Sequence, residues 1–304
     1  MRPIFFEVTL PVIGEVTFPA FMTMMMVGFV VAIWLGRREG ERLGMRGDHI
    51  VDLGLVLLVL GVMGSRLFAV FTDGMFMDFV HLCTDPKLVD AIDAKVKTCT
   101  ADAQCGYDYL CDTARHVCYP PRDCLAAFKF WQGGLTFYGG VMLAWPGGMW
   151  FAHRKGLGMW RMADIVAPLL MVGLFFGRFG CFFNGCCYGA PTDSWLGVTF
   201  PPQSGRPPGP LHPVQLYESA AAAVIFAVLY FVIRTRKRGD GELFGWMMVM
   251  YGVWRFSIEW LRVDPRGALG PLSTSQVVSI PMILGGIGLI LWARRHGKLA
   301  STPP

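Results

Sequence analysis

The segment Gly177–Gly189, GRFGCFFNGCCYG, follows the apolar run Ile165–Phe176 with an arginine, an asparagine and three cysteines. An arginine at the hydrocarbon boundary costs on the order of 2.5–3.5 kcal/mol on insertion scales, and such residues usually face a bundle interior or a wet cavity. Four glycines among these thirteen residues disfavour regular helix and expose backbone N–H groups. Exposed backbone is tolerated at membrane depth only where it lines a cavity. The segment therefore predicts the wall of a pocket for an anionic ligand.

The composition excludes an ordinary soluble domain, because 54% of the 304 residues are hydrophobic and only 16% are charged. Seven apolar runs are long enough to cross a hydrocarbon core of about 30 Å. They are Phe18–Leu35, Asp52–Phe71, Leu135–Phe151, Ala163–Phe183, Val214–Ile233, Leu243–Leu261 and Val277–Ala293. The sequence therefore predicts an all-α polytopic membrane protein with seven transmembrane helices.

The net charge of +5 follows from where the cations lie and does not indicate a nucleic-acid partner. Basic residues cluster after the first, third, fifth and seventh runs. They are Arg37, Arg38, Arg42, Arg46, Arg154, Lys155, Arg161, Arg234, Arg236, Lys237, Arg238, Arg294, Arg295 and Lys298. By the positive-inside rule, the N-terminus lies outside and the C-terminus in the cytoplasm. Residues 1–17 are expected to form a short outer segment on the bilayer, with the first run as an uncleaved anchor.

Residues 73–129 differ from the membrane runs, because they are acidic and rich in cysteine. The cysteines are Cys83, Cys99, Cys105, Cys111, Cys118 and Cys124, all on the predicted outer side. They predict a disulfide-stapled insert, and six cysteines allow fifteen pairings among which the sequence does not choose. A zinc site is the alternative, but the paired C-x2-C spacing is missing. The insert, expected to be an accessory cap or partner-binding module, separates residues 1–72 from residues 130–304.

Two polar residues near the insert each have a structural and a functional interpretation. Arg66, near the outer end of the second run, either extends to the lipid headgroups or lines a pocket. Tyr138 enters the third run between Gly133-Gly134 and Gly139-Gly140. Its phenol either belongs to the interfacial aromatic belt or lies beside exposed backbone at the mouth of a site.

The fifth run begins with several polar residues. Pro213 suits the first helical position, so His212 would cap this helix, with Gln215, Tyr217 and Glu218 in its first two turns. Glu218 alone is explained by the helix dipole. Four polar groups at one membrane boundary are nevertheless more than capping requires.

The sixth run contains Arg255, Glu259 and Arg262 at positions i, i+4 and i+7, which predicts that they share one helix face. They form either a structural ion-pair group or a surplus of positive charge for an anionic ligand. Guanidinium groups are well matched to phosphate oxygens.

Polar residues from five runs are thus predicted on the same, outer side of the membrane. They are Arg66, Tyr138, Arg178, Asn184, His212, Glu218, Arg255, Glu259 and Arg262. Unrelated polar residues would be scattered over both leaflets. Their convergence predicts one cavity, open to the outer compartment and to lipid, that binds a phosphate.

Four sequence blocks resemble the signature of the prolipoprotein diacylglyceryl transferases, in that family's order. They are Gly133-Gly134-x3-Tyr138-Gly139-Gly140; Gly177-Arg178-Phe179-Gly180 with Phe183-Asn184-Gly185 and Tyr188-Gly189; His212-Pro213-x-Gln215-Leu216-Tyr217-Glu218; and Tyr251-Gly252-x2-Arg255-x3-Glu259-x2-Arg262. The resemblance implies a bacterial inner-membrane enzyme with its active site toward the outer leaflet. Such an enzyme moves the diacylglyceryl group of phosphatidylglycerol to the lipobox cysteine thiol of a preprolipoprotein signal peptide and releases glycerol phosphate.

Residue roles follow from the same resemblance. Arg178 would hold the lipid phosphate, and Arg255 would neutralise the charge that grows on the leaving phosphate. Tyr138 and His212 are the candidate bases for the thiol proton. The further expected substrate-binding residues are Asn184, Arg66, Gln215, Tyr217, Glu218, Glu259 and Arg262. The expected partners are phosphatidylglycerol, preprolipoprotein signal peptides and membrane lipid, with no metal ion, cofactor or nucleic acid.

This chain departs from the family pattern at four positions. It has Tyr138 where the family commonly has histidine, Phe21 near a tyrosine position, Cys181 at an asparagine position and Cys186 at an acidic position. An unperturbed phenol, with a pKa near 10, is mostly protonated at neutral pH. Tyr138 would therefore act as a base only if an arginine lowered its pKa, and the arginines could instead lower the pKa of the substrate thiol.

Cys181, Cys186 and Cys187 leave several interpretations open. They are small apolar fillers, an outer-facing disulfide, or a thiol-exchange site. A bond between the vicinal pair would form a strained ring, so any disulfide would involve Cys181. Thiol exchange would make the protein a membrane thiol-disulfide oxidoreductase. The departures at Tyr138 and Cys186 suggest another alternative, a non-catalytic paralogue that binds lipid or lipoprotein.

Overall fold

The structure is a computed structural model that describes residues 4–10, 14–72, 76–89, 99–102, 105, 109–128, 136–201, 206–263, 268–269 and 271–296. The chain forms two compact units. The first unit comprises residues 1–51 and 155–304, and the second unit comprises residues 52–154.

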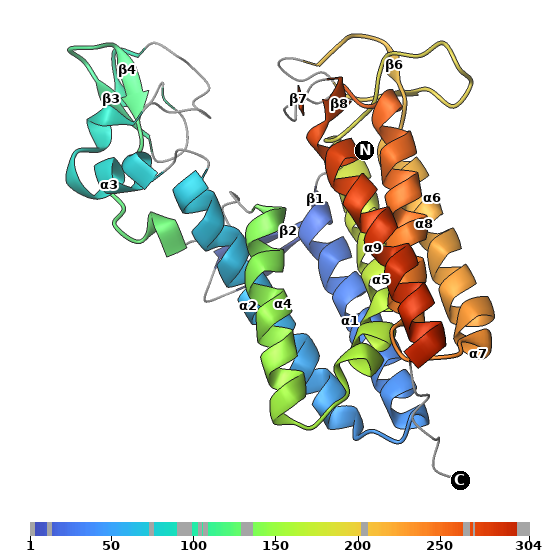
Figure 1. Ribbon diagram of the computed structural model, residues 1–304. Helices are drawn as coiled ribbons and strands as arrows, with labels where there is room; N and C mark the ends of the chain where they lie inside the picture. Colours follow the sequence, from blue (N-terminus) through green and yellow to red (C-terminus); the bar gives the residue numbers. More distant parts are fainter. Residues whose placement is uncertain are drawn as a thin grey trace. The chain divides into compact units, whose positions relative to one another are not determined.

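Helices cover most of each of the seven predicted runs (Figure 1). They are α1 (Ala20–Arg42), α2 (Gly47–Thr72), α4 (Phe137–Arg154), α5 (Met159–Asn184), α6 (Val214–Ala227), α8 (Glu242–Ile258) and α9 (Thr274–His296). A π-helical turn, Val228–Ile233, and the short α7 (Arg234–Arg236) continue α6.

Five helical segments are long and apolar enough to cross a membrane by length and composition. They are Ala20–Arg42, Gly47–Phe71, Met159–Asn184, Val214–Arg236 and Thr274–His296. The helices α4 and α8 have 18 and 17 residues. The chain is therefore a mainly helical, polytopic membrane protein.

The expectation of a purely helical chain is incomplete, because the described residues also form four two-stranded antiparallel sheets. The pairs are β1 (Ile4–Leu10) with β2 (Gly14–Pro19), β3 (Leu110–Asp112) with β4 (Val117–Tyr119), β5 (Val198–Thr199) with β6 (Pro210–Leu211), and β7 (Ala268–Leu269) with β8 (Leu272–Ser273). The first pair occupies much of the segment expected to lie on the bilayer. Its Phe5 ring lies edge-on to Phe183 of α5, with ring centroids 5.0 Å apart.

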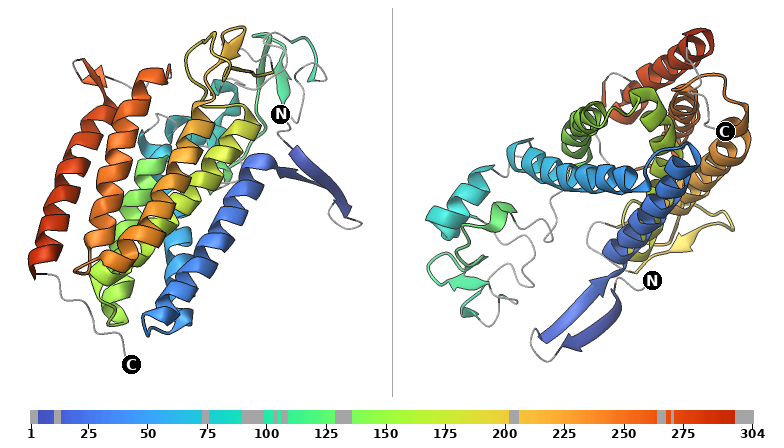
Figure 2. Two further views of the ribbon diagram at one scale, coloured as in Figure 1. Left: turned by 90° about the vertical axis from the view of Figure 1, so that its right-hand side faces the viewer. Right: turned by 90° about the horizontal axis from the view of Figure 1, so that it is seen from below.

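In the first unit, α1 packs on α5, α5 on α6, and α8 on α9 (Figure 2). Small residues permit this close approach. A Cβ atom at Gly28 would lie 2.8 Å from the Phe176 side chain, and one at Gly252 would lie 2.7 Å from Ile283. These glycines therefore have a packing role that ordinary side chains could not fill without a shift of the helices.

The core of the first unit lies between α5, α6 with its π-helical continuation, and α8. Its buried members are Ala167, Met171, Ile225, Leu229, Leu243 and Met247. This core aligns the three helices whose ends carry the predicted polar residues, so it fixes where those residues can meet.

Backbone hydrogen bonds connect the chain at one end of this bundle, where Figure 1 labels β6, β7 and β8. The Gly189 N–H donates to the His212 carbonyl at 2.8 Å, and the Ala190 N–H donates to the Leu261 carbonyl at 2.9 Å. A bridge between Gly189 and Arg262 adds to these bonds. The segment after α5 is therefore joined to the start of α6 and to the chain that follows α8.

In the second unit, α2 and α4 pack through Gly64, Gly139 and Gly140. A Cβ atom at Gly64 would lie 2.9 Å from the Leu143 side chain, and one at Gly140 would lie 2.5 Å from the Ser65 hydroxyl. The Thr136 N–H donates to the Ser65 carbonyl at 3.1 Å, which fixes the chain just before α4.

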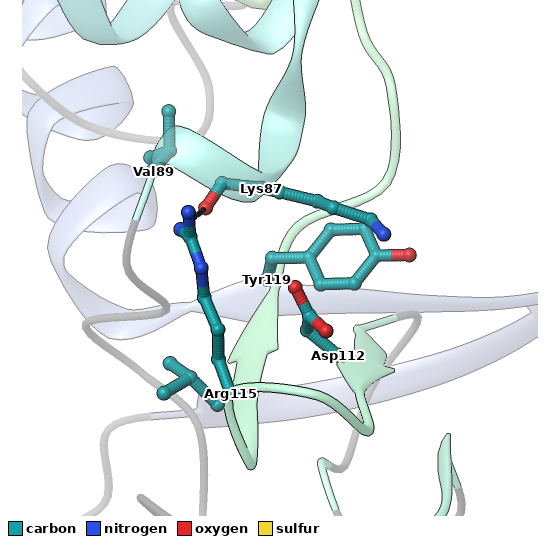
Figure 3. A pocket seen from close by; sticks show the side chains of 6 residues that line it. Lys87, Val89, Asp112, Arg115 and Tyr119 are labelled. Atoms are coloured by element: carbon teal, nitrogen blue, oxygen red, sulfur yellow. Dashed lines mark hydrogen bonds between the residues drawn. The ribbon is translucent and has the colours of Figure 1, made fainter.

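The described part of the cysteine-rich insert is held by three disulfides, which join Cys83 to Cys124, Cys99 to Cys111, and Cys105 to Cys118. It contains α3 (Phe76–Thr84), two 3-10 turns (Pro86–Leu88 and Ala126–Phe128) and the β3–β4 hairpin. Lys87, Asp112, Arg115 and Tyr119 surround a cavity of about 30 Å³ (Figure 3). That volume suits a water molecule and excludes a lipid headgroup.

Candidate active site

Two arginines from different segments share one carboxylate in the first unit. They lie at the end where the chain after α5 bonds to the start of α6, which we call the connected end. Arg178 Nε of α5 lies 2.8 Å from Glu218 Oε2 of α6, and Arg262 Nη1 lies 3.2 Å from the same oxygen. The Glu218 and Arg262 side chains are each only 2% exposed. The predicted meeting of these three residues is therefore present in the structure.

A second ion pair lies at the end of α8. Arg255 Nη1 is 2.7 Å from Glu259 Oε2, one helical turn further along, and Arg255 Nη2 donates to the Ser275 hydroxyl at 2.7 Å. Ser275 belongs to the first turn of α9, so this guanidinium is fixed between two helices. The i, i+4 part of the sequence prediction is confirmed.

Arg262 does not continue the helix face that its i+7 spacing predicted. The chain forms a 3-10 turn over Glu259–Leu261 (η6), and Arg262 is extended, with φ −96° and ψ 147°. Its bridge to Gly189 pulls it out of helical geometry. Arg262 consequently reaches Glu218 on α6, and this contact joins α8 to α5 and α6.

Tyr251 connects the two groups of charges, because it interacts electrostatically with Glu218, Arg178, Arg255 and Arg262. We call Arg178, Glu218, Arg255, Glu259 and Arg262 the guanidinium cluster. Among the residues that the structure describes, it holds three cations and two carboxylates, a surplus of one positive charge.

Buried acceptor atoms at the cluster lack partners among the described residues. Glu218 Oε1 and Gln215 Oε1 are buried and accept no hydrogen bond there. Gln215 is fully buried, and its Nε2 donates to the Cys186 carbonyl at 2.6 Å. Unsatisfied buried acceptors are uncommon in folded proteins and indicate a group that is completed by a ligand or water.

His212 and Tyr217 are adjacent at the start of α6, with His212 Nδ1 3.3 Å from the Tyr217 hydroxyl. Helix α6 begins at Val214 with Pro213 as its N-cap, one residue later than the sequence predicted. Both side chains remain half-buried. His212 is therefore at the connected end, and its backbone is fixed by Gly189 and Ala190.

Asn184 ends α5 and is exposed, and Gly185 caps the helix with φ 70° in the left-handed region. Arg206 donates to the carbonyls of Gly185 and Pro201, and its guanidinium lies 5.1 Å from the centre of the Tyr188 ring. Arg206 thereby holds the turn that follows α5.

The three cysteines of this region are free thiols, and their sulfur atoms lie within 4.8 Å of one another. The pKa of the Cys187 thiol lies below its ordinary value, because the Cys181 and Cys186 thiols hydrogen-bond to it and Arg178 and Arg262 add positive charge. The thiols therefore adjoin the guanidinium cluster.

Arg66 and Tyr138 belong to the second unit. The buried Arg66 donates to the carbonyls of Ala126 and Ala127 at 2.7 and 2.8 Å, and it lies 5.1 Å from the Phe79 ring centre. Tyr138, the second residue of α4, is 53% exposed. The Gly133-Gly134 motif lies outside the described residues.

The sequence reasoning missed three residues as members of the site. Tyr251 had a usable signal, because it precedes Arg255 by one helical turn within the same sequence block. The sequence held no such signal for Ser275 or Arg206. A serine in the first turn of a helix is ordinary, and so is an arginine in a Pro/Gly-rich loop.

Comparison with known proteins identifies the family. The sequence model of the family described as "Prolipoprotein diacylglyceryl transferase" matches residues 7–93 and 103–292. The chain belongs to this family. The thiol-disulfide oxidoreductase alternative is not favoured by this membership.

Relatives from several bacteria are similar over nearly the whole chain. Three of them are described here, and all three carry the name phosphatidylglycerol–prolipoprotein diacylglyceryl transferase. The one from Chromohalobacter salexigens is 32% identical over 90% of this chain and 87% of its own length. The relative from Nitratidesulfovibrio vulgaris strain DP4 is 32% identical over 94% of this chain and 92% of its own. The relative from Pseudoalteromonas atlantica is 30% identical over 95% and 90%.

Proposed function

We propose that this protein transfers the diacylglyceryl group of phosphatidylglycerol to the lipobox cysteine of a preprolipoprotein signal peptide. Both substrates, phosphatidylglycerol and prolipoprotein, are part of the name that the relatives carry. The observation that carries the proposal is the surplus positive charge of the guanidinium cluster. The phosphodiester of phosphatidylglycerol has one negative charge. Bound at the guanidinium cluster, it would cancel the surplus positive charge there.

The proposal includes a placement in the bacterial inner membrane with seven spans, in which α4 and α8 cross as well. The N-terminus is outside, the C-terminus is in the cytoplasm, and the guanidinium cluster faces the outer leaflet. The basic residues at the opposite helix ends support this orientation. The three disulfides support an outer position for residues 73–129, since disulfides persist in oxidising compartments.

The reaction forms a C–S bond and breaks a C–O bond. The thiol sulfur attacks the glyceryl carbon that carries the phosphate, and the phosphate leaves with the other glycerol. As the C–O bond breaks, negative charge grows on the leaving oxygen. Arg178 holds the phosphate, and Arg255, fixed by Glu259 and Ser275, stabilises that growing charge. Fixed cations lower such a barrier because they need no reorganisation during the reaction.

The thiol proton must leave as the C–S bond forms, and it ends on the released phosphate or in solvent. His212 is the candidate base in the first unit, and its contact with Tyr217 orients the imidazole. Tyr138 is the second candidate. Asn184, Gln215, Tyr217 and Arg66 complete the proposed substrate-binding set.

The experiment combines the purified protein with phosphatidylglycerol and a lipobox peptide and measures the thioether product by mass spectrometry. We expect product with wild-type protein and none with Arg178→Ala. Tyr138→Phe and His212→Ala distinguish the two candidate bases, since only loss of the true base lowers kcat. If folded wild-type protein forms no thioether and does not rescue cells depleted of their own transferase, the proposal is wrong.

A further inference from the structure

The turn after α5 brings three free thiols together. Cys181 lies in the last turn of α5, whereas Cys186 and Cys187 follow its left-handed cap, Gly185. All three sulfur atoms lie within 4.8 Å of one another, and all three residues are half-buried. Neither the transfer reaction nor the ion pairs described above use these thiols.

The backbone holds this arrangement in place without a ligand. The Cys186 N–H donates to the Cys181 carbonyl at 3.2 Å, which folds the chain back over the helix end. Cys187 has φ 61°, in the left-handed region that residues with a side chain rarely adopt. Gln215 and Arg206 hold the carbonyls of Cys186 and Gly185. The thiols are therefore positioned in advance.

Sulfur ligands select soft metal ions, above all monovalent copper and zinc. A metal–thiolate bond of about 2.3 Å places three sulfurs around a trigonal ion about 4.0 Å apart, which is within the 4.8 Å limit on the distances between the three sulfur atoms. Structural zinc takes four ligands. Among the described residues, no histidine or carboxylate joins the three sulfurs as a fourth ligand. A three-coordinate site suits monovalent copper better than zinc.

We propose that Cys181, Cys186 and Cys187 bind one monovalent copper ion as three thiolate ligands. Each thiol that coordinates releases its proton to solvent, and copper stays monovalent, so no oxidant or reductant is required. This site departs from the expectation, drawn from the sequence, of a protein without a metal ion.

Copper binding would also affect catalysis. Cys187 adjoins Arg178 and Arg262, and Gln215 connects Cys186 to the start of α6. An ion held by the three sulfurs would fix this turn against the guanidinium cluster, so we expect copper to slow diacylglyceryl transfer. The effect on transfer rests on the proposed function, whereas copper binding does not.

The test titrates the full-length protein, with the three disulfides of the insert intact, in detergent with Cu(I) under anaerobic conditions, against bathocuproine disulfonate as a competing chelator. We expect one equivalent of copper to stay on the protein, with a thiolate-to-copper absorption band. Replacing all three cysteines with serine removes the band, and each single replacement weakens retention at least tenfold. A set of cysteine-to-alanine variants repeats the test if a serine variant fails to fold.

Met25→Leu provides a matched control, because the Met25 sulfur lies next to Gly177 and thioethers also bind copper. We expect this variant to retain copper as the wild-type protein does. The proposal is overturned if wild-type protein retains no copper, if the triple variant retains as much, or if Met25→Leu loses as much as the triple variant. A disulfide between two of the three cysteines in protein isolated without reductant also overturns it. These readouts do not depend on transferase activity. Failure of the copper site can therefore be distinguished from failure of the proposed function.

Discussion

Both ends of the first unit carry ion pairs, but the net charge of the paired residues differs between the two ends. At the end opposite the guanidinium cluster, ion pairs join four acidic and four basic residues, which we call the balanced cluster. They are Glu39, Asp164, Asp240 and Glu242, with Arg42, Arg234, Lys237 and Arg294. The guanidinium cluster instead has three basic and two acidic members.

The two ends also differ in how completely the carboxylates are bonded. Asp164 accepts from Lys237 Nζ at 2.9 Å and from the N–H groups of Gly241 and Phe244 at 3.0 and 3.1 Å. Burial lowers the pKa of Lys237, but Asp164 and Asp240 outweigh it and raise the pKa above its ordinary value. Glu218, in contrast, has one oxygen without a partner among the described residues.

The comparison separates structural from functional charge. In the balanced cluster each carboxylate is paired with a cation, and these ion pairs tie the helices together. A surplus guanidinium group provides a site for an anion, whereas the open acceptors Glu218 Oε1 and Gln215 Oε1 suit a ligand's hydroxyl group. Matched substitutions at the two ends can therefore test this distinction.

The largest effect is expected at the balanced end, from Asp164→Ala. The substitution leaves Lys237 partly buried without this partner and two N–H groups without their acceptor, so stability should fall by about 3–5 kcal/mol. Because the Lys237 pKa is raised in the folded state, this contribution is fully present at neutral pH and is lost only as the pH rises through that value. Denaturant unfolding measures the loss. Transfer per folded molecule should stay normal, and a lower kcat would contradict the separation.

Arg255→Ala should lower kcat by about 10²–10³-fold, because it removes a fixed cation from the leaving phosphate. Arg255→Lys should recover only part of the activity, since an ammonium group lacks the planar fork that contacts Glu259 and Ser275 together. Steady-state kinetics with phosphatidylglycerol measure both. Wild-type kcat in the alanine variant would remove Arg255 from the mechanism.

Glu218→Gln and Glu242→Gln form a matched pair, because both side chains are 2% exposed and both carboxylates bind arginine. Each substitution weakens hydrogen bonds to charged groups and should cost about 1–3 kcal/mol of stability. Only Glu218→Gln should also reduce transfer, since it releases Arg178. Equal activity losses in the two variants would show that the ends do not differ in function.

The smallest effect is expected from Arg294→Ala. Its side chain is 42% exposed, and an exposed ion pair contributes only about 0–1 kcal/mol. A thermal melt should therefore shift little, and transfer should not change. A loss of activity comparable with that of Arg255→Ala would contradict the account.

The sequence predicted much of this architecture for identifiable reasons. Apolar runs located the helices, and the spacing of Arg255 and Glu259 predicted their ion pair. Spacing failed for Arg262, because the bridge to Gly189, distant in sequence, ends the helix before it. The pairing of Cys83 with Cys124 likewise depends on contacts between segments far apart in the chain. Local patterns carry no information on such contacts.

Some expectations stay predictions. Arg66 and Tyr138 belong to the second unit, and their roles at the substrate rest on sequence blocks alone. The contact of Arg66 with the Ala126 and Ala127 carbonyls shows what it does within that unit, where it ties α2 to the end of the insert. A side chain that holds the insert and one that binds lipid have the same sequence signature, an arginine near the end of a span.

The central claim is that the surplus guanidinium charge binds the phosphate of a phospholipid. The most direct test measures the thermal stability of detergent-solubilised protein with phosphatidylglycerol and with diacylglycerol of the same acyl chains. Phosphatidylglycerol at 100 times its Kd should stabilise the wild-type protein by about 2.7 kcal/mol and diacylglycerol by far less. The effect should vanish in the Arg178→Ala/Arg255→Ala double variant and persist in Arg294→Ala. Equal stabilisation by both lipids, or an unchanged effect in the double variant, would contradict the claim.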